Sequence, residues 1–160
     1  MKVIALITYI YFISKIPDIH EAWKYHAAEH KAINCYESQD DLTVENAMKH
    51  SRFLPRCSTT FVILVFILSI FFYSFIPESV SFYTNLILRI LFLPIIAGFT
   101  YELMLIRGRY DNPITRVLTW PGMQFQRLTT TPAQPKHVTI AVKALKKAVQ
   151  KEESFESPSD

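Results

Sequence analysis

Glycine and cysteine are scarce in this sequence, which has 3 Gly and 2 Cys among 160 residues. So little glycine argues against glycine-rich nucleotide-binding loops and favours long helices with few turns. The two cysteines, Cys35 and Cys57, are too few for a disulfide framework, which leaves free thiols or metal ligands as the alternatives. The net charge is only +3 and the basic residues do not form one stripe, so we expect no nucleic-acid partner.

Hydrophobic residues make up 50% of the sequence and concentrate in three apolar segments, at about residues 3–16, 59–76 and 86–106. A membrane-spanning helix needs roughly 17–25 residues. The first segment is short for a span, and a tilted or interfacial helix fits it best. The second is uncharged and long enough to cross. The third is interrupted by charged residues and by Pro94, where we expect a kink.

The distribution of basic residues predicts the orientation of these segments. The loop between the second and third segments, residues 77–85, contains no Lys or Arg. The basic residues lie before the second segment and after the third: Lys49, Arg52, Arg56, Arg107, Arg109 and Arg116. By the positive-inside rule, both of these ends are cytoplasmic. We therefore expect an all-α, multi-pass protein of the cell (inner) membrane, with a transmembrane hairpin and with amphipathic helices in cytoplasmic residues 17–57 and 107–160.

The polar segments between and after the apolar ones also predict helices. Pro17 suits the first turn of a helix that continues through Asn34. Thr43 can cap a second helix, with Glu45 in its first turn.

The C-terminal third of the chain completes the predicted architecture. Residues 113–131 are typical of an interfacial or packing segment, broken at Pro121-Gly122. Residues 136–151 have apolar side chains at helical spacing, which predicts an amphipathic helix. We expect residues 1–151 to form a single membrane-embedded helical domain and residues 152–160 to form a disordered tail.

The strongest chemical signal is the segment Tyr25-His26-Ala27-Ala28-Glu29-His30-Lys31. On a helix, His26 and His30 project from one face, so both imidazoles can reach one zinc ion at about 2.0–2.1 Å each. Glu29 beside them could orient a ligand or act as a general base toward a metal-bound water. The His-x-x-Glu-His pattern arises by chance in roughly 1% of shuffled sequences of this composition, so it is suggestive only. The alternative is a helix whose histidines hydrogen-bond to neighbouring groups.

A zinc site needs at least one further ligand. Glu102 is the acid that lies inside an apolar segment, and an ionisable group there is a functional candidate by default. Cys57 precedes the second apolar segment, at the same cytoplasmic side. The alternatives are a Glu102 carboxylate paired with a nearby arginine and an inert, buried Cys57. Cys35 and Glu37 are weaker candidates.

Several short motifs follow one another along the chain: Tyr25-His26-Ala27-Ala28-Glu29-His30-Lys31, Cys35-Tyr36-Glu37, Leu42-Thr43-Val44-Glu45-Asn46, Ser51-Arg52-Phe53-Leu54-Pro55-Arg56-Cys57, Ala97-Gly98-Phe99-Thr100-Tyr101-Glu102 and Pro121-Gly122. In this order they resemble the YqhQ-like bacterial membrane proteins over residues 4–145. The resemblance implies a domain of unknown function that is often labelled a metal-dependent enzyme. It also implies longer members with additional N-terminal sequence. Leu54 stands where the family commonly has His, which removes one candidate ligand.

Two functions of different classes remain open. In the first, the protein is a membrane-bound metal-dependent hydrolase. His26, His30 and Glu102, with Cys57 as a further candidate, hold a divalent metal, Zn²⁺ by preference, and Glu29 activates its water. In the second, a structural metal or polar cluster belongs to a noncatalytic scaffold or regulator of a membrane protein complex. The expected partners are the lipid bilayer and either another membrane protein or a second copy of this chain.

Overall fold

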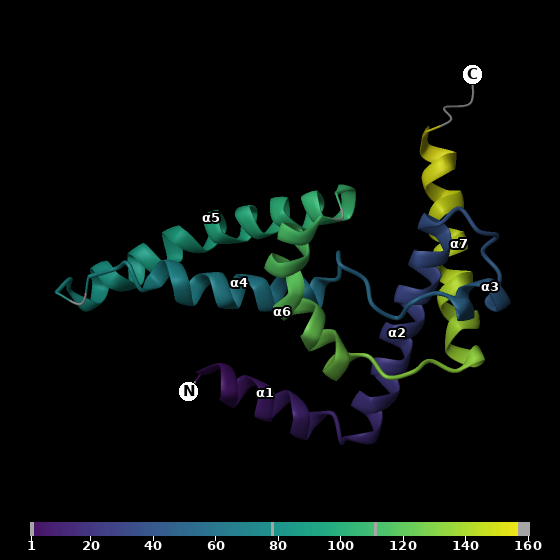
Figure 1. Ribbon diagram of the computed structural model, residues 1–160, viewed down its shortest axis with the longest axis horizontal. Coiled ribbons are helices and arrows are strands. Elements are labelled where there is room, and N and C mark those ends of the chain that lie inside the picture. The colour runs from purple at the N-terminus through teal and green to yellow at the C-terminus, as the bar shows by residue number, and fades with distance from the viewer. Residues whose placement is uncertain (1, 78, 111, 157–160) are drawn as a thin grey trace. The chain divides into compact units, whose positions relative to one another are not determined.

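The computed structural model describes residues 2–77, 79–110 and 112–156, which form helices with no β-strand among them (Figure 1). The all-α prediction is therefore confirmed. In chain order the helices are α1 (Lys2–Ile13), α2 (Pro17–Glu37), α3 (Val44–Lys49), α4 (Ser58–Tyr73), α5 (Phe82–Arg109), α6 (Pro113–Thr129) and α7 (Pro135–Glu156).

The contacts between residues divide the chain into two compact units. The first consists of Met1–Leu54 and Arg127–Asp160, and we call it the α2–α7 unit. The second consists of Pro55–Gln126, and we call it the hairpin unit. It contains α4, α5 and most of α6. The single domain expected for residues 1–151 stays a prediction.

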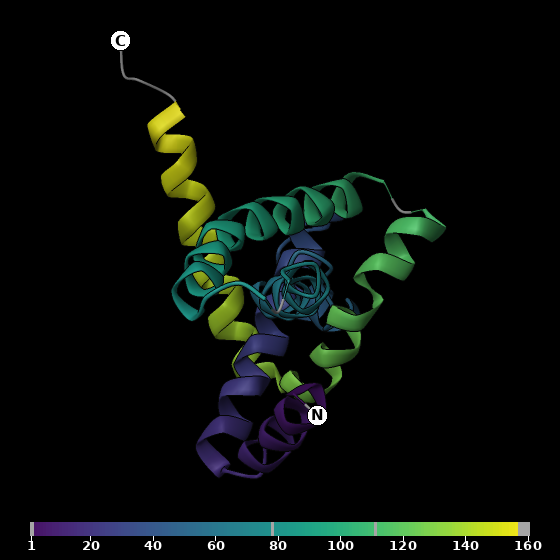
Figure 2. The ribbon, with the colours of Figure 1, turned by 90° about the vertical axis from the view of Figure 1, so that its left-hand side faces the viewer.

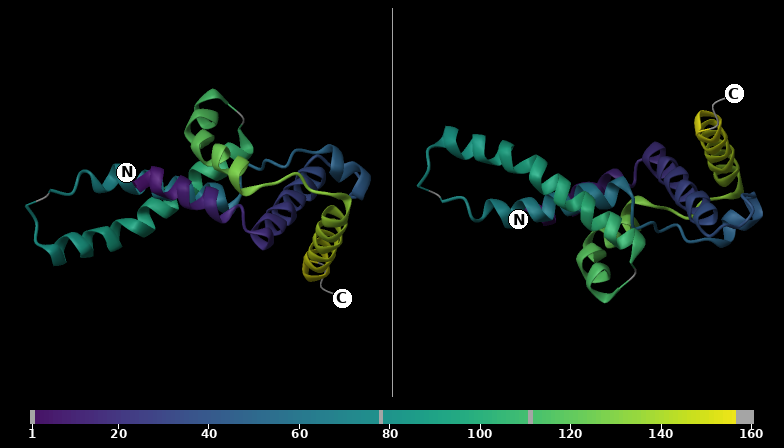
Figure 3. Two further views of the ribbon diagram at one scale, coloured as in Figure 1. Left: turned by 90° about the horizontal axis from the view of Figure 1, so that it is seen from below. Right: turned by 90° about the horizontal axis from the view of Figure 1, so that it is seen from above.

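A row of small side chains on α2 forms the centre of the α2–α7 unit. Ala28, Ala32 and Cys35 are at most 1% exposed and form one cluster with Val138 and Val142 of α7. Short side chains let the axes of two packed helices come closer together. α2 and α7 accordingly run side by side (Figures 1 and 3). The amphipathic C-terminal helix that the sequence predicts is thus confirmed, with its apolar face on α2.

Polar contacts fix the start of α7 against α2. Glu21 accepts hydrogen bonds from Lys136 Nζ and His137 Nε2 at 2.8 Å each, and from Lys24 Nζ at 2.9 Å. The bond from Lys136, followed by those from His137 and Lys24, lowers the pKa of Glu21 well below its ordinary value. The buried His137 ring accepts from Gln134 N through Nδ1 at 3.0 Å. Nδ1 is therefore unprotonated, and Nε2 carries the proton that is donated to Glu21.

The predicted starts of two helices in this unit are confirmed. Pro17 occupies the first turn of α2, where its missing N–H costs no helical hydrogen bond. Thr43 caps α3, because its side chain accepts a hydrogen bond from Asn46 N at 3.2 Å. Glu45 lies in the first turn of α3, where the helix dipole favours a negative charge.

Helices α4 and α5 pack along each other as a helical hairpin (Figures 1 and 3). Near the closed end, Tyr73 donates its hydroxyl proton to Arg89 O at 2.9 Å, and the Arg89 guanidinium lies 5.0 Å from the centre of the Tyr73 ring. Arg89 Nε also donates to Asn85 Oδ1. The Arg89 charge, inside the third apolar segment, thus contacts Asn85 and Tyr73 of the hairpin itself. α5 continues as one helix through Pro94.

Among the described residues, α5 is the one helix that is long and apolar enough to cross a membrane. It has 28 residues, and its most apolar 18-residue window has a mean hydropathy of 1.8 and is only 11% buried. At 1.5 Å per residue, α5 is about 42 Å long and α4 about 24 Å, against a hydrocarbon layer of about 30 Å. The 12 residues of α1 reach only about 18 Å. The transmembrane hairpin itself stays a prediction.

Two sequence expectations about helix ends differ from the structure. The break expected at Pro121-Gly122 is wrong, because α6 continues through both residues as one helix (Figure 2). A proline removes one hydrogen bond from a helix, and surrounding packing can compensate for this loss. In addition, α7 extends to Glu156, into the region expected to be a disordered tail. The last part of that tail, residues 157–160, lies outside the described residues.

Candidate metal centre

The two histidines of the His-x-x-Glu-His motif lie side by side on α2. Their ring centroids are 4.4 Å apart, with an angle of 66° between the ring planes. One nitrogen of each ring lies within 4.8 Å of one nitrogen of the other. His30 is 2% exposed and His26 is partly buried. The spacing of four residues therefore brings the imidazoles together, as the sequence predicts.

Each of these imidazoles uses its Nδ1 atom in a hydrogen bond to a backbone carbonyl group. His26 Nδ1 lies 3.0 Å from Thr129 O, and His30 Nδ1 lies 2.6 Å from Arg52 O. Because a carbonyl oxygen only accepts, Nδ1 carries the proton in both rings. In the neutral ring the lone pair is then on Nε2. Backbone carbonyls commonly fix metal-binding histidines in this tautomer and orientation.

Two further side chains of α2 bind the same neighbouring segment as His30. The carbonyl groups that accept from His30, Lys31 and Asn34 belong to Met48, His50, Ser51, Arg52 and Phe53. Lys31 Nζ donates to Met48 O at 2.7 Å and to His50 O at 2.6 Å. Asn34 Nδ2 donates to Ser51 O at 2.8 Å and to Phe53 O at 3.1 Å. We call residues 48–53 the carbonyl strap. Side chains of α2 therefore replace the backbone partners that a helix or strand would give this segment.

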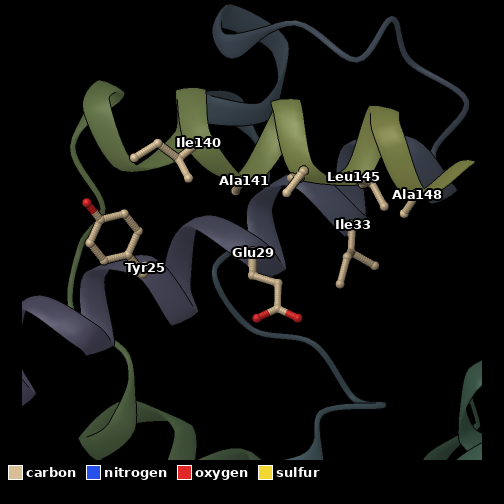
Figure 4. A pocket seen from close by; sticks show the side chains of 9 residues that line it. Tyr25, Glu29, Ile33, Ile140, Ala141, Leu145 and Ala148 are labelled. Carbon is tan, nitrogen blue, oxygen red and sulfur yellow. The ribbon is translucent and has the colours of Figure 1, made fainter. Parts of the chain in front are cut away.

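Glu29 lies on a neighbouring face of α2 and is exposed. Tyr25 and Ile33, one turn before and after it, line a groove with it (Figure 4). The other wall of this groove belongs to α7. The groove has a volume of about 360 Å³. The structure thus places the Glu29 carboxylate on the rim of an apolar groove, and its role as a general base stays a prediction.

The candidate third ligands, Cys57 and Glu102, belong to the hairpin unit. Cys57 is 4% exposed and precedes α4, where its Sγ accepts a hydrogen bond from Thr59 N at 3.3 Å. A helix N-terminus favours negative charge, and the thiolate is the form of cysteine that binds metals. Glu102 is exposed on α5, on the side opposite the buried Thr100. That Cys57 and Glu102 share a site with the histidines stays a prediction.

The two weaker candidates lie at the end of α2. Cys35 is buried in the cluster between α2 and α7, and its thiol donates to Asp41 O at 3.6 Å. Burial raises the pKa of Cys35, and the charges of Asp40 and Asp41 raise it further. A thiol held in its protonated form is a poor metal ligand. Glu37, the last residue of α2, is exposed.

The sequence interpretation assigned no role to Lys31 or Asn34, although Lys31 follows His30 directly and Asn34 lies one helical turn after it. The available signal was their spacing, since His30, Lys31 and Asn34 project from adjacent positions of one helix. A second signal was the short polar segment after α3, whose backbone groups need partners. Together these features indicate that side chains of α2 bind the backbone carbonyl groups of residues 48–53.

The comparisons with known proteins identify a family. A family described as "Protein of unknown function (DUF1385)" matches residues 1–151. The chain belongs to this family. The "Uncharacterized protein YqhQ" of Bacillus subtilis (strain 168) is 34% identical over 152 residues, which cover 94% of this chain and 48% of that protein. The chain therefore spans about half the length of this curated relative. No solved structure matches the chain.

The resemblance to YqhQ-like proteins is thus confirmed, but it supplies no activity. Both descriptions leave the function of the family open.

Proposed function

We propose that this member of the DUF1385 family is a membrane-anchored metal-binding protein in which His26 and His30 bind one divalent metal ion. The observation that supports this most is the pair of Nδ1 hydrogen bonds to backbone carbonyls. They leave the lone pair of each ring on Nε2, in two rings whose centroids are 4.4 Å apart. Two imidazole nitrogens suit zinc, which prefers nitrogen and sulfur ligands.

Cys57 is the third ligand that we propose, for a reason of chain connectivity. The Arg52 carbonyl binds His30 directly, and Cys57 follows only five residues later in the chain. Five residues span at most roughly 18 Å, so Cys57 cannot lie far from this carbonyl group. Its Sγ lies at the start of α4, where the helix dipole stabilises negative charge. Glu102 is the alternative third ligand.

The hairpin of α4 and α5 is the proposed membrane anchor. Only 11% of the apolar window of α5 is buried, which is unlike the core helix of a soluble domain. Large apolar side chains of both helices are exposed, including Ile70, Phe71, Leu91 and Phe99. A lipid environment would remove this surface from water, with the basic ends of the hairpin in the cytoplasm.

Metal analysis of variants tests the histidine pair. Asparagine can keep a donor where Nδ1 lies, but it lacks Nε2, so His26→Asn and His30→Asn remove the ligands and preserve the carbonyl contacts. We expect detergent-purified wild type to carry stoichiometric zinc by mass spectrometry and both variants to lose it. His20→Asn, which changes an exposed histidine of the same helix, should keep it. A wild type that neither carries zinc nor binds added zinc would refute the proposal.

The cysteines provide a second matched comparison. Cys57→Ser should weaken zinc binding in a competition titration with a chromophoric chelator, because a hydroxyl is a poorer zinc ligand than a thiolate. Cys35→Ser should leave zinc affinity unchanged. Loss of zinc in Glu102→Gln together with full affinity in Cys57→Ser would assign the third ligand to Glu102 instead.

A metal-dependent hydrolase is the second candidate function. The observation that favours it is the exposed Glu29 carboxylate, which precedes His30 and lines a groove. A catalytic zinc polarises a bound water and keeps one position open, whereas a structural zinc has four protein ligands. X-ray absorption spectra of the zinc-loaded protein distinguish these cases. An oxygen ligand in addition to the protein ligands assigned by the variants above, which persists in Glu29→Gln, supports the hydrolase. A closed shell of protein ligands supports the noncatalytic scaffold.

A further inference from the structure

Helix α6 has an inverted distribution of polar and apolar side chains. Within the hairpin unit, its buried residues are Thr115, Thr119, Gly122, Phe125 and Gln126, so most of its buried side chains are polar or small and Phe125 is the apolar exception. Its exposed large apolar residues are Ile114, Val117, Leu118 and Trp120. At 100° per residue the centres of these two sets lie about 130° apart around the helix. A helix on the surface of a soluble protein shows the reverse pattern.

The polar groups of the buried face have partners inside the hairpin unit. Gln126 Nε2 donates to Thr60 Oγ1 of α4 at 2.6 Å. Thr119 Oγ1 donates to Thr115 O at 2.7 Å, and Thr115 Oγ1 donates to Tyr110 O at 3.0 Å. The Thr119 hydroxyl thus binds a carbonyl group of its own helix, and the Thr115 hydroxyl binds a carbonyl group at the end of α5, so neither needs water as a partner. The buried face is thus satisfied by protein, so its polarity does not require solvent.

Gly122 explains how a polar face can pack so closely. A Cβ atom at Gly122 would lie 3.1 Å from Thr60 Cα and 2.5 Å from Thr60 Cγ2. The backbones of α6 and α4 therefore touch at this point. Close contact through glycine and threonine, with interhelical hydrogen bonds, is the packing mode of helices within membranes.

We propose that α6 lies in the interfacial layer of the membrane, with its exposed apolar face in contact with lipid. The four apolar side chains of that face are between 49% and 72% exposed, which is costly in water and favourable against acyl chains. The same arrangement continues in the hairpin, where Thr60 and Thr100 are buried while most of the α5 surface is apolar and exposed. The proposal rests on the membrane anchoring proposed above and adds a third membrane-embedded helix.

The residues beside the apolar face fit the depth of lipid headgroups. Arg116 and Trp120, one turn apart, line a shallow groove with Val117. Tryptophan and arginine concentrate at membrane interfaces, where an aromatic ring or an aliphatic stem contacts acyl chains and the polar end reaches the headgroups. A lipid surface therefore suits this face, because its exposed apolar side chains lie beside Trp120, a residue type that concentrates at membrane interfaces.

Tryptophan fluorescence tests the placement, because the chain has two tryptophans, Trp23 in α2 and Trp120 in α6. Trp23→Phe leaves Trp120 as the reporter, and Trp120→Phe leaves Trp23 as the matched control. Each variant is reconstituted into phosphatidylcholine–phosphatidylglycerol vesicles whose acyl chains are brominated near the headgroup. We expect Trp120 emission to be strongly quenched by the brominated lipid and shielded from acrylamide in the water. Trp23 emission should show a clearly smaller lipid effect.

The outcomes separate this inference from the proposed function. If the protein resists alkaline carbonate extraction while Trp120 is quenched by acrylamide and not by brominated lipid, α6 lies outside the bilayer and the inference is wrong, but the anchored hairpin stands. If Trp120 is quenched by neither and its emission changes when the protein is diluted in the membrane, a second copy covers the face, which also overturns the inference. Complete extraction by carbonate would refute the membrane anchor itself.

Discussion

Removal of the Lys31 ammonium group should release the carbonyl strap from α2. Lys31→Met keeps a chain of similar length but cannot donate to the two carbonyl groups that now lie 2.7 and 2.6 Å from Nζ. A hydrogen bond from a charged group contributes about 1.5–3 kcal/mol, and each bond also leaves an acceptor to be resolvated when it is lost. Burial lowers the pKa of Lys31, and Arg52 lowers it further, so the ammonium is partly desolvated in the folded state. This desolvation offsets part of the gain.

The net effect that we expect is about 2–3 kcal/mol for opening of the strap, which corresponds to a roughly 30- to 150-fold larger opening equilibrium. Hydrogen exchange of peptides that cover residues 48–53, followed by mass spectrometry in detergent, measures this quantity directly. Lys143→Met, at an exposed position of α7, is the matched control and should leave exchange unchanged. Strap exchange in Lys31→Met within about threefold of wild type would show that the strap does not depend on these bonds.

Contacts inside each of the two units support three further predictions. The pKa of Glu21 is lowered, chiefly by the hydrogen bond from Lys136. The ionised Glu21 carboxylate therefore contributes fully to stability above its ordinary pKa of 4.5, and this contribution is lost as the pH falls below that value. Glu21→Gln should make the stability of α7 less dependent on pH, as hydrogen exchange corrected for the intrinsic rate would show. Gly122→Ala places a Cβ 3.1 Å from a backbone atom of α4 and should destabilise the protein by about 1–3 kcal/mol in a detergent unfolding titration. Gly98→Ala is the control, because nothing lies within 4 Å of the new Cβ. This variant should be neutral or stabilise the protein by up to about 1 kcal/mol. Because burial raises the pKa of Cys35, a maleimide should label this thiol at neutral pH only after unfolding, as peptide mass spectrometry would show.

Much of the secondary structure could be predicted because local signals decide it. The apolar segments, the proline at the start of α2 and the threonine cap of α3 each act within a few residues. Helix α6 shows where such reasoning fails, since Pro121-Gly122 is a strong local break signal. The close approach of Gly122 to Thr60, more than 60 positions earlier in the chain, is a tertiary contact that no local pattern encodes.

The candidate site was predictable to a similar extent. The spacing of His26 and His30 on one helix sufficed to bring their rings together. The carbonyl groups of Arg52 and Thr129 that set their tautomers come from distant positions and carry no side-chain signature, so only a three-dimensional structure reveals them. The sequence points to Cys57 as a ligand through its predicted position at the cytoplasmic side of the membrane, and that assignment stays a prediction.

The order of synthesis has a consequence for the α2–α7 unit. α2 ends at Glu37 and α7 begins at Pro135, so translation adds about a hundred residues between them, which takes about 5–20 s at ~5–20 residues per second. During this interval the alanine row of α2 lacks α7, although α3, which contributes Ala47 to the same cluster, is translated soon after α2. Closure of the unit is therefore a late event in biogenesis, and a ribosome stalled before Pro135 should leave α2 open to chaperones and proteases.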